Sequence, residues 1–327
     1  MAKSSKIYEL MLKIGAKQDS SLKKACADAD KNLSKLSKSA KAVGKVVAGA
    51  SIAVATTVAT AGVAAVKSGI DYQKQLANVS TLLTGTEAEI SARTAEIGKD
   101  ILKVSNDTGV ETANLTDGMY QVISAFGDSK DAMGILETSA KAAAAGNATT
   151  TDSVNLLSAV MKGYNDVSEE SAQKAADLSF ATVRLGQTSF SELASSIGKV
   201  VPLSSALNIL HEDLFGVFAT LTGVTGSTAE VATQYKAVLS GLMTPSKDMA
   251  ASLKKLGFST ADAAIKSLGF QGTLEALKGT VHGDEQAMAK LFSSTEAQTA
   301  VLAMCGAQSE NLTNKTAEMY TATGAAN

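Results

Sequence analysis

Four short motifs constrain this chain most, because each of them can begin a helix. In the pattern Ser/Thr-x-x-Glu, each side chain can bond a backbone N–H that the first helical turn leaves free. The motif occurs at Thr86–Glu89, Ser189–Glu192, Ser227–Glu230 and Ser293–Glu296. From residue 71 onward the sequence therefore predicts a string of helices, each of roughly one to two dozen residues.

Glycines follow the expected helices, as they do where a helix ends. They are Gly109, Gly127, Gly146, Gly163, Gly186, Gly226, Gly257 and Gly269. Between them, apolar residues recur at helical spacing. Three such stripes are Ile90, Ile97, Ile101 and Val104; Met119, Val122, Ile123 and Phe126; and Leu214, Val217, Phe218 and Leu221. Sustained alternation of the strand type is hard to find, so the predicted fold class is all-α.

The composition favours helices that meet through small side chains. Trp is absent and aromatic residues make up 4% of the chain. Few large side chains mean little buried apolar area per residue, which is unlike the dense core of an enzyme. We expect an elongated helical protein, with an N-terminal coiled-coil-type helix followed by a multi-helix body.

The N-terminal arm predicts self-association. Small or apolar residues recur at steps of mostly three and four, which is a narrow coiled-coil seam. The seam is Ile7, Met11, Ile14, Leu22, Cys26, Ala29, Leu33, Leu36, Ala40 and Val43. Residues 1–67 hold twelve Lys and four acids, a net charge of +8, against −10 for the remainder. Because the arm lacks Arg and has one aromatic residue, it favours at most non-specific contact with DNA.

An uncharged run of twenty-one residues, Val46–Val66, is long enough to cross a bilayer. Ile52 and six Val give only a marginal drive for insertion, and the rest are mostly Ala, Thr and Gly. Close helix packing is the favoured interpretation, through Gly49, Ile52, Ala53, Val54, Val58 and Gly62. The alternative is a membrane-active helical protein, a pore former that inserts through residues 46–66.

These features divide the chain into four segments. Residues 1–43 form the basic amphipathic arm, and residues 44–69 the apolar helix rich in Ala, Val, Gly and Thr. Residues 70–258 form a helical domain, and residues 259–327 form further helices. The end, TATGAAN, carries no capping signal or final packing element, so we expect the last segment to continue in a longer chain.

Motifs for catalysis or cofactors are weak. His211 stands before Glu212 and Asp213, where a residue of a helix N-terminus is a simpler interpretation than a general base. His282 lies in a loop-like stretch. GVTGSTAE (223–230) could hold an anion at a helix start but lacks the P-loop lysine. GYNDVSEE (163–170) lacks the D-x-D-x-D-G spacing and terminal Glu of a calcium-binding loop. Cys26 and Cys305 are isolated. We expect no enzyme, metal or cofactor.

Residues 72–256 resemble the core region of phage tail tape measure proteins of the TP901 family. Single phrases are weak, and their order is what carries the resemblance. The chain departs from the family pattern at three places. Tyr72 stands where the family usually has Phe, and Glu230–Thr233 replaces an Ala-Gly-Thr phrase. Lys236 stands at the position of the basic residue that follows this phrase in the family. The similar phrases are DYQKQLANVSTLLTGTEAEI, ILKVSNDTGVETANLTDGMYQVISAFG, the run from residue 136 to 209 that includes Pro202, and the run 212–246 that closes on Pro245-Ser246.

The resemblance implies a structural role. Such proteins run inside the growing tail tube and their length sets where the tube stops, after which they leave ahead of the DNA. The implied partners are further copies in a trimer or hexamer, the tail tube protein, tail assembly chaperones and the tail tip or baseplate hub protein. The host membrane on ejection is a further implied contact. The implied location is the virion, inside the tail tube, and the host cytoplasm during assembly.

Overall fold

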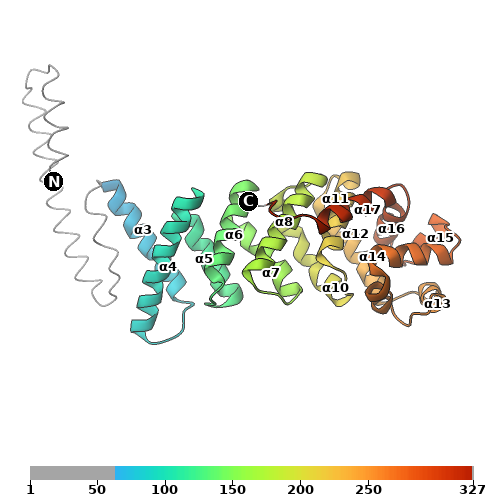
Figure 1. Cartoon of the computed structure of the whole chain (residues 1–327), viewed down its shortest axis with the longest axis horizontal. Coiled ribbons are helices and arrows are strands. Elements are labelled where there is room, and N and C mark those ends of the chain that lie inside the picture. Colours follow the sequence, from blue (N-terminus) through green and yellow to red (C-terminus); the bar gives the residue numbers. More distant parts are fainter. Residues whose placement is uncertain (1–62, 326–327) are drawn as a thin grey trace, which may run out of the picture. The chain divides into compact units, whose positions relative to one another are not determined.

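The computed structural model describes the backbone of residues 63–325 and the side chains of residues 71–325. Residues 63–325 form fifteen α-helices, one 3-10 helix and no strand, which confirms the all-α prediction (Figure 1). The first eight helices are α3 (Val63–Ser80), α4 (Glu87–Thr108), α5 (Thr112–Phe126), α6 (Ala132–Ala145), α7 (Thr150–Gly163), α8 (Glu169–Leu185), α9 (Phe190–Ser196) and α10 (Val201–Ala206). The remaining helices are α11 (His211–Thr225), α12 (Thr228–Met243), α13 (Lys247–Lys255), α14 (Ala261–Thr280), α15 (Glu285–Lys290), α16 (Thr295–Cys305) and α17 (Ser309–Tyr320), and the 3-10 helix η1 (Ile197–Lys199) joins α9 to α10.

The chain divides into two compact units. The described residues of the first unit are 63–74 and 86–95, and those of the second are 75–85 and 96–325. The predicted arm, residues 1–43, and residues 44–62 of the apolar segment lie outside the described residues. Residues 63–66, the end of the uncharged run, begin α3.

Two of the four predicted capping boxes are complete. At the start of α9, Ser189 Oγ accepts from the Glu192 N–H at 3.3 Å, and Glu192 Oε2 accepts from the Ser189 N–H at 3.0 Å. At the start of α4, the Thr86 N–H donates to Glu89 Oε2 at 2.8 Å, and the Glu89 N–H donates to Thr86 Oγ1 at 3.4 Å. Each pair satisfies two free N–H groups, as the sequence predicted.

The other two boxes differ from the prediction. Ser227 Oγ accepts from the Glu230 N–H at 3.3 Å, but the Glu230 carboxylate accepts from Gln234 Nε2 at 2.9 Å instead of returning to the cap. The box at Ser293 was wrong by one residue, because Ser294 caps α16. The backbone bends at residues 292–294, so the helix begins only after Ser294.

The predicted helix stops are mostly correct. Gly226 ends α11 in the left-handed conformation, at φ 65°, and its N–H bonds the Thr222 carbonyl at 2.8 Å. Gly269 lies inside α14 at φ 75° and kinks it. Gly163 differs, because it is the last residue of α7 rather than a residue beyond it. A Cβ there would lie 3.3 Å from Val201 Cβ, so this glycine permits close approach of α10.

Helices α5 to α8 pack against their neighbours in the chain (Figure 1). Small residues lie at these contacts. Gly118 in α5 is one such close point, since a Cβ there would lie 2.6 Å from Thr150 Cγ2 in α7 and 3.0 Å from Leu136 Cδ1 in α6. In α6 the alanines Ala140, Ala142 and Ala143 are buried. Short side chains let the backbones approach, as the composition predicted.

Helix α11 is the centre of the second unit. Every residue from 212 to 222 is buried. The sequence predicted one apolar face, and all four of its residues are buried: Leu214, Val217, Phe218 and Leu221. The opposite side is buried too, because α8, α12, α16 and α17 contact α11 from different directions. Aromatic rings extend this core, with Phe218, Tyr235 and Phe270 in edge-to-face contact at centroid distances of 6.4 and 5.8 Å.

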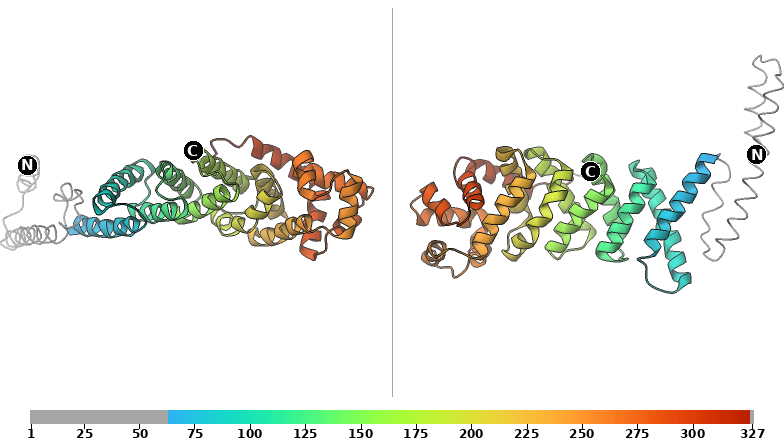
Figure 2. Two further views of the ribbon diagram at one scale, coloured as in Figure 1. Left: turned by 90° about the horizontal axis from the view of Figure 1, so that it is seen from below. Right: turned by 180° about the vertical axis from the view of Figure 1, so that it is seen from behind.

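Helix α17 returns to the middle of the chain. It packs on α11 and α8, and Figure 2 shows the end of the described chain beside α8. Lys315 Nζ donates to the Ala219 carbonyl at 2.9 Å, and Arg184 pairs with Glu318 at 3.0 Å. In TATGAAN, where the sequence predicted no packing element, the Gly324 N–H donates to Asp177 Oδ2 at 2.9 Å. Every residue except proline has a backbone N–H, so the sequence does not indicate which one will bond a distant carboxylate.

Candidate functional site

The start of α11 gathers most of the buried ionisable groups of the second unit. His211 is the first residue of the helix, and its ring stacks on Tyr164 at a centroid distance of 3.8 Å. Glu212, also buried, pairs with Lys174 at 2.7 Å. Burial, aided by Lys174, lowers the pKa of His211, and the nearby carboxylates Glu212 and Asp166 oppose that shift. The imidazole is therefore held neutral at the helix N-terminus, which agrees with the simpler sequence interpretation.

Asp213 is the most perturbed carboxylate of this cluster. Burial raises the pKa of Asp213 to about 6, and the charge of Glu212 adds to the rise. A hydrogen bond from the Phe270 backbone N–H partly offsets it. The buried Tyr235 and the half-buried Tyr164 also have their pKa values raised by loss of solvent around the hydroxyl. Together these groups form buried caps and pairs that fix α11 against α7, α8 and α14.

His282, the second histidine, lies in the turn between α14 and α15. It is exposed and has a left-handed backbone, at φ 57°. Asp284, two residues later, caps α15 by accepting from the Gln286 N–H at 2.8 Å. The predicted loop before a helix is confirmed.

Residues 223–230 span the end of α11, a two-residue loop of Gly226 and Ser227, and the start of α12, where a side-chain carboxylate lies near the helix N-terminus. Glu192 Oε2 accepts from Thr228 Oγ1 at 3.3 Å, and Thr228 is the first residue of α12. Thr188 Oγ1 lies 2.6 Å from the same Thr228 hydroxyl. The predicted loop and capped helix are confirmed, and the negative group beside the N-terminus is supplied from α9.

The acidic stretch of residues 163–170 is a tight connection between α7 and α8. Asn165 is left-handed, at φ 58°. Asp166 Oδ1 accepts from both the N–H and the Oγ of Ser168, at 3.2 and 2.8 Å, and Ser168 caps α8. The carboxylate thus orders the helix start. Among residues 71–325, no group of three His, Cys, Asp or Glu side chains is placed to hold a metal ion.

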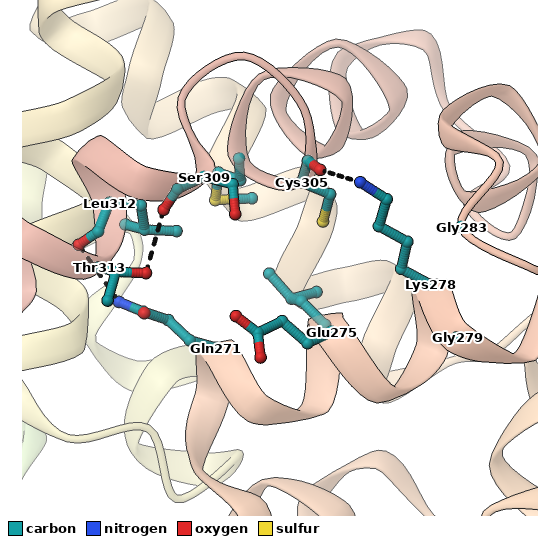
Figure 3. A pocket seen from close by; sticks show the side chains of 11 residues that line it. Gln271, Glu275, Lys278, Gly279, Gly283, Cys305, Ser309, Leu312 and Thr313 are labelled. Carbon is teal, nitrogen blue, oxygen red and sulfur yellow. Dashed lines mark hydrogen bonds between the residues drawn. The ribbon is translucent and has the colours of Figure 1, made fainter.

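A pocket of about 270 Å³ lies where α14, α16 and α17 meet (Figure 3). Lys278 Nζ donates to the Cys305 carbonyl at 2.6 Å on one side, and Gln271 Nε2 donates to the Leu312 carbonyl at 3.3 Å on the other. Glu275 points into the space between them (Figure 3). Burial raises the pKa of the Cys305 thiol to about 11, which makes it unreactive at neutral pH. Cys305 and the polar residues of α14 that line this pocket gave no sequence signal, because they are far apart in the chain.

The predicted site residues of the N-terminal segments lie outside the described residues. This applies to the self-association seam, from Ile7 to Val43, and to the close-packing residues, from Gly49 to Gly62. Among the residues that the structure describes, no helix is long and apolar enough to cross a bilayer. Insertion through residues 46–66 stays a prediction, which liposome flotation of the chain tests.

Close helix packing and helix caps define an all-helical body, and comparison with known proteins agrees. Residues 98–306 match the family model described as "Phage-related minor tail protein", and the chain belongs to this family. It is 25% identical over 289 residues to the "Probable tape measure protein" of Clostridium phage phiCD119. The alignment covers 84% of this chain and 30% of that relative, so the chain spans less than a third of the relative's length. No solved structure matches it.

These matches confirm the predicted resemblance to phage tail tape measure proteins. Both matches are to phage tail proteins and not to enzymes. A phage tail protein is a component of the virion.

Proposed function

We propose that this chain belongs to a tape measure protein, a structural ruler and scaffold that sets tail tube length during assembly and is released on ejection. The observation that carries the proposal is the similarity over 84% of the chain to a probable tape measure protein. The helical fold supports it, because an α-helix rises about 1.5 Å per residue and so converts residue number into distance.

The packed unit sets a limit on which residues measure length. Because α17 folds back onto α11, residues 96–325 do not extend as one continuous helix. In the proposal, this unit is a folded module of the scaffold, and the length is measured by extended helical segments elsewhere in the longer protein.

The proposed partners follow from this role. Copies of the chain associate through the arm seam, as a trimer or hexamer, inside the tail tube protein. Tail assembly chaperones shield the chain in the host cytoplasm, and the tail tip or baseplate hub protein anchors it. On ejection the chain leaves the tail and meets the host membrane, and its contact with DNA is non-specific.

Tail length measured by electron microscopy tests the ruler. Deleting ~70 residues from an extended helical segment of the full-length protein, outside the packed unit, should shorten tails by about 105 Å. The matched control replaces the same segment with an unrelated helical sequence of equal length and should leave the tails unchanged. Tails of wild-type length in the deletion variant would contradict the proposal.

A further inference from the structure

Exposed apolar side chains gather around the first turn of α11. Within residues 71–325, seven large apolar side chains are exposed, and three of them adjoin this turn. They are Val167, Leu210 and Tyr320, which are 49%, 51% and 53% exposed. We call these three residues the α11 patch. Clustered exposed apolar residues mark interaction sites, whereas scattered ones are ordinary.

Three separate segments of the chain build the α11 patch. Leu210 directly precedes α11. Val167 follows Tyr164 by three residues, and the Tyr164 ring stacks on His211, so the α7–α8 connection lies against the start of α11. Tyr320 ends α17, which packs on α11, and the charges of Asp213 and Glu212 reach its hydroxyl.

The rim of the α11 patch is acidic. Beside Val167, Asp166 lies in the α7–α8 connection, and Glu169 and Glu170 lie in the first turn of α8. Lys174, in the second turn of α8, is paired with Glu212 at 2.7 Å and so adds little positive charge to the rim. An apolar surface with an acidic rim favours a cationic amphipathic partner.

We propose that the α11 patch binds residues 6–43 of the basic arm of a second copy of this chain. This part of the arm has the matching chemistry, since its predicted seam is apolar and it holds nine Lys and four acids, a net charge of +5. The seam also predicts that arms of different copies associate, which brings the arm of one copy to the body of another. The proposal does not depend on the ruler role.

Cross-linking of the full chain tests this contact. Natural-abundance and ¹⁵N-labelled copies are mixed, left to exchange, and treated with a zero-length carbodiimide reagent. Mass spectrometry should find links between arm lysines and Asp166, Glu169 or Glu170 that join one light copy to one heavy copy. High salt should lower their yield, because the rim pairs are exposed to solvent.

Two variants with equally exposed sites give the matched comparison. Leu210→Glu places a charge in the α11 patch and should lower the mixed-isotope links about tenfold. Val224→Glu is the control, because Val224 is also 51% exposed but lies near the other end of α11. Val167→Lys, in a loop, is a second patch variant and should lower the yield as well. Circular dichroism establishes that each variant is folded.

Three outcomes would overturn the proposal. The first is the absence of these links in the wild-type chain. The second is links that join only residues of the same isotope, which would place the arm on its own body. The third is equal yield in Leu210→Glu and Val224→Glu.

Discussion

The carboxylate of Asp213, at the start of α11, lies near the backbone N–H of Phe270, the first residue after the kink at Gly269, and this N–H lowers the pKa of the carboxyl. The first N–H groups after a kink lack carbonyl partners in their own helix, so a nearby acceptor favours the start of the second half of α14. Burial of this carboxylate opposes its charge, so the pKa of Asp213 rises to about 6 in spite of this N–H.

Replacing Asp213 with Asn should stabilise the protein at pH 7. The folded pKa of about 6 exceeds the ordinary 3.8, so the folded state binds the proton more tightly. Stability from this group is therefore fully present below about pH 4 and is lost as the pH rises through 6. Because Asn keeps an acceptor without the charge, Asp213→Asn should gain up to about 3 kcal/mol at pH 7.

Urea unfolding at pH 7 and pH 4 measures this effect. The gain of Asp213→Asn over the wild type should shrink as the pH falls. Asp117→Asn is the control, since Asp117 is exposed in the middle of α5. A variant that is less stable than the wild type at pH 7 would show that the charged cap outweighs burial.

Gly216 should not tolerate a methyl group. A Cβ at Gly216 would overlap the Thr316 side chain and lie 3.1 Å from Thr316 Cα in α17. We expect Gly216→Ala to destabilise the fold by about 1–2 kcal/mol, although Ala favours helices. Gly223→Ala is the matched control in the same helix, because its Cβ would meet only Lys315 Nζ, at 3.9 Å. It should be neutral or slightly stabilising.

Thermal unfolding of both glycine variants tests the α11–α17 contact. Adding Thr316→Ala to Gly216→Ala should recover part of the loss, because the methyl group then has room. The Thr316 hydroxyl is buried without a hydrogen bond to a described residue, so removing it costs little. Equal stability of the two single variants would contradict the close packing.

Glu192 should contribute more to the free energy of unfolding than Glu230, although both are exposed residues of predicted capping boxes. Glu192 accepts from the Ser189 N–H and from Thr228 Oγ1, and so connects α9 to α12. Glu230 accepts from Gln234 within its own helix. We expect Glu192→Ala to cost about 1 kcal/mol and Glu230→Ala a few tenths, measured by urea unfolding. The reverse order would refute the bridging role.

The Cys305 thiol should react slowly while the protein is folded. Burial raises its pKa from 9.0 to about 11, so at pH 8 the thiolate fraction falls about 100-fold. In a Cys26→Ser variant, the reaction of Cys305 with a disulfide reagent should be slower by at least that factor than in urea. The folded rate should rise as the pH approaches 11. Equal rates in the folded and unfolded protein would mean that the pocket leaves the thiol exposed.

Local signals in the sequence predicted helix boundaries well. Ser189 and Glu192 form the predicted box because both partners lie within one turn, and Gly226 ends α11 because its conformation is decided locally. The Ser293 prediction failed by one residue because two adjacent serines can both cap a helix. The turn around buried Phe292 then selects Ser294.

Contacts between segments that are distant in the chain could hardly be predicted from the sequence. The stripe of Leu214 and Val217 predicted one buried face of α11, but the burial of Gly216 depends on α17, about a hundred residues later. Asp213 looked like an ordinary first-turn acid, and only the fold brings Phe270 to it. A small residue or a single carboxylate has no periodic pattern that indicates its distant partner.

The Gly216–Thr316 contact also affects when the core of the second unit can be completed during synthesis. The two residues are 100 positions apart in the sequence, so α17 can pack on Gly216 only after both have been made. At about 5–20 residues per second, synthesis takes roughly 5–20 s to supply the helix that covers Gly216. For that period a newly made chain presents an incomplete core, and this is the interval in which the proposed tail assembly chaperones would bind it.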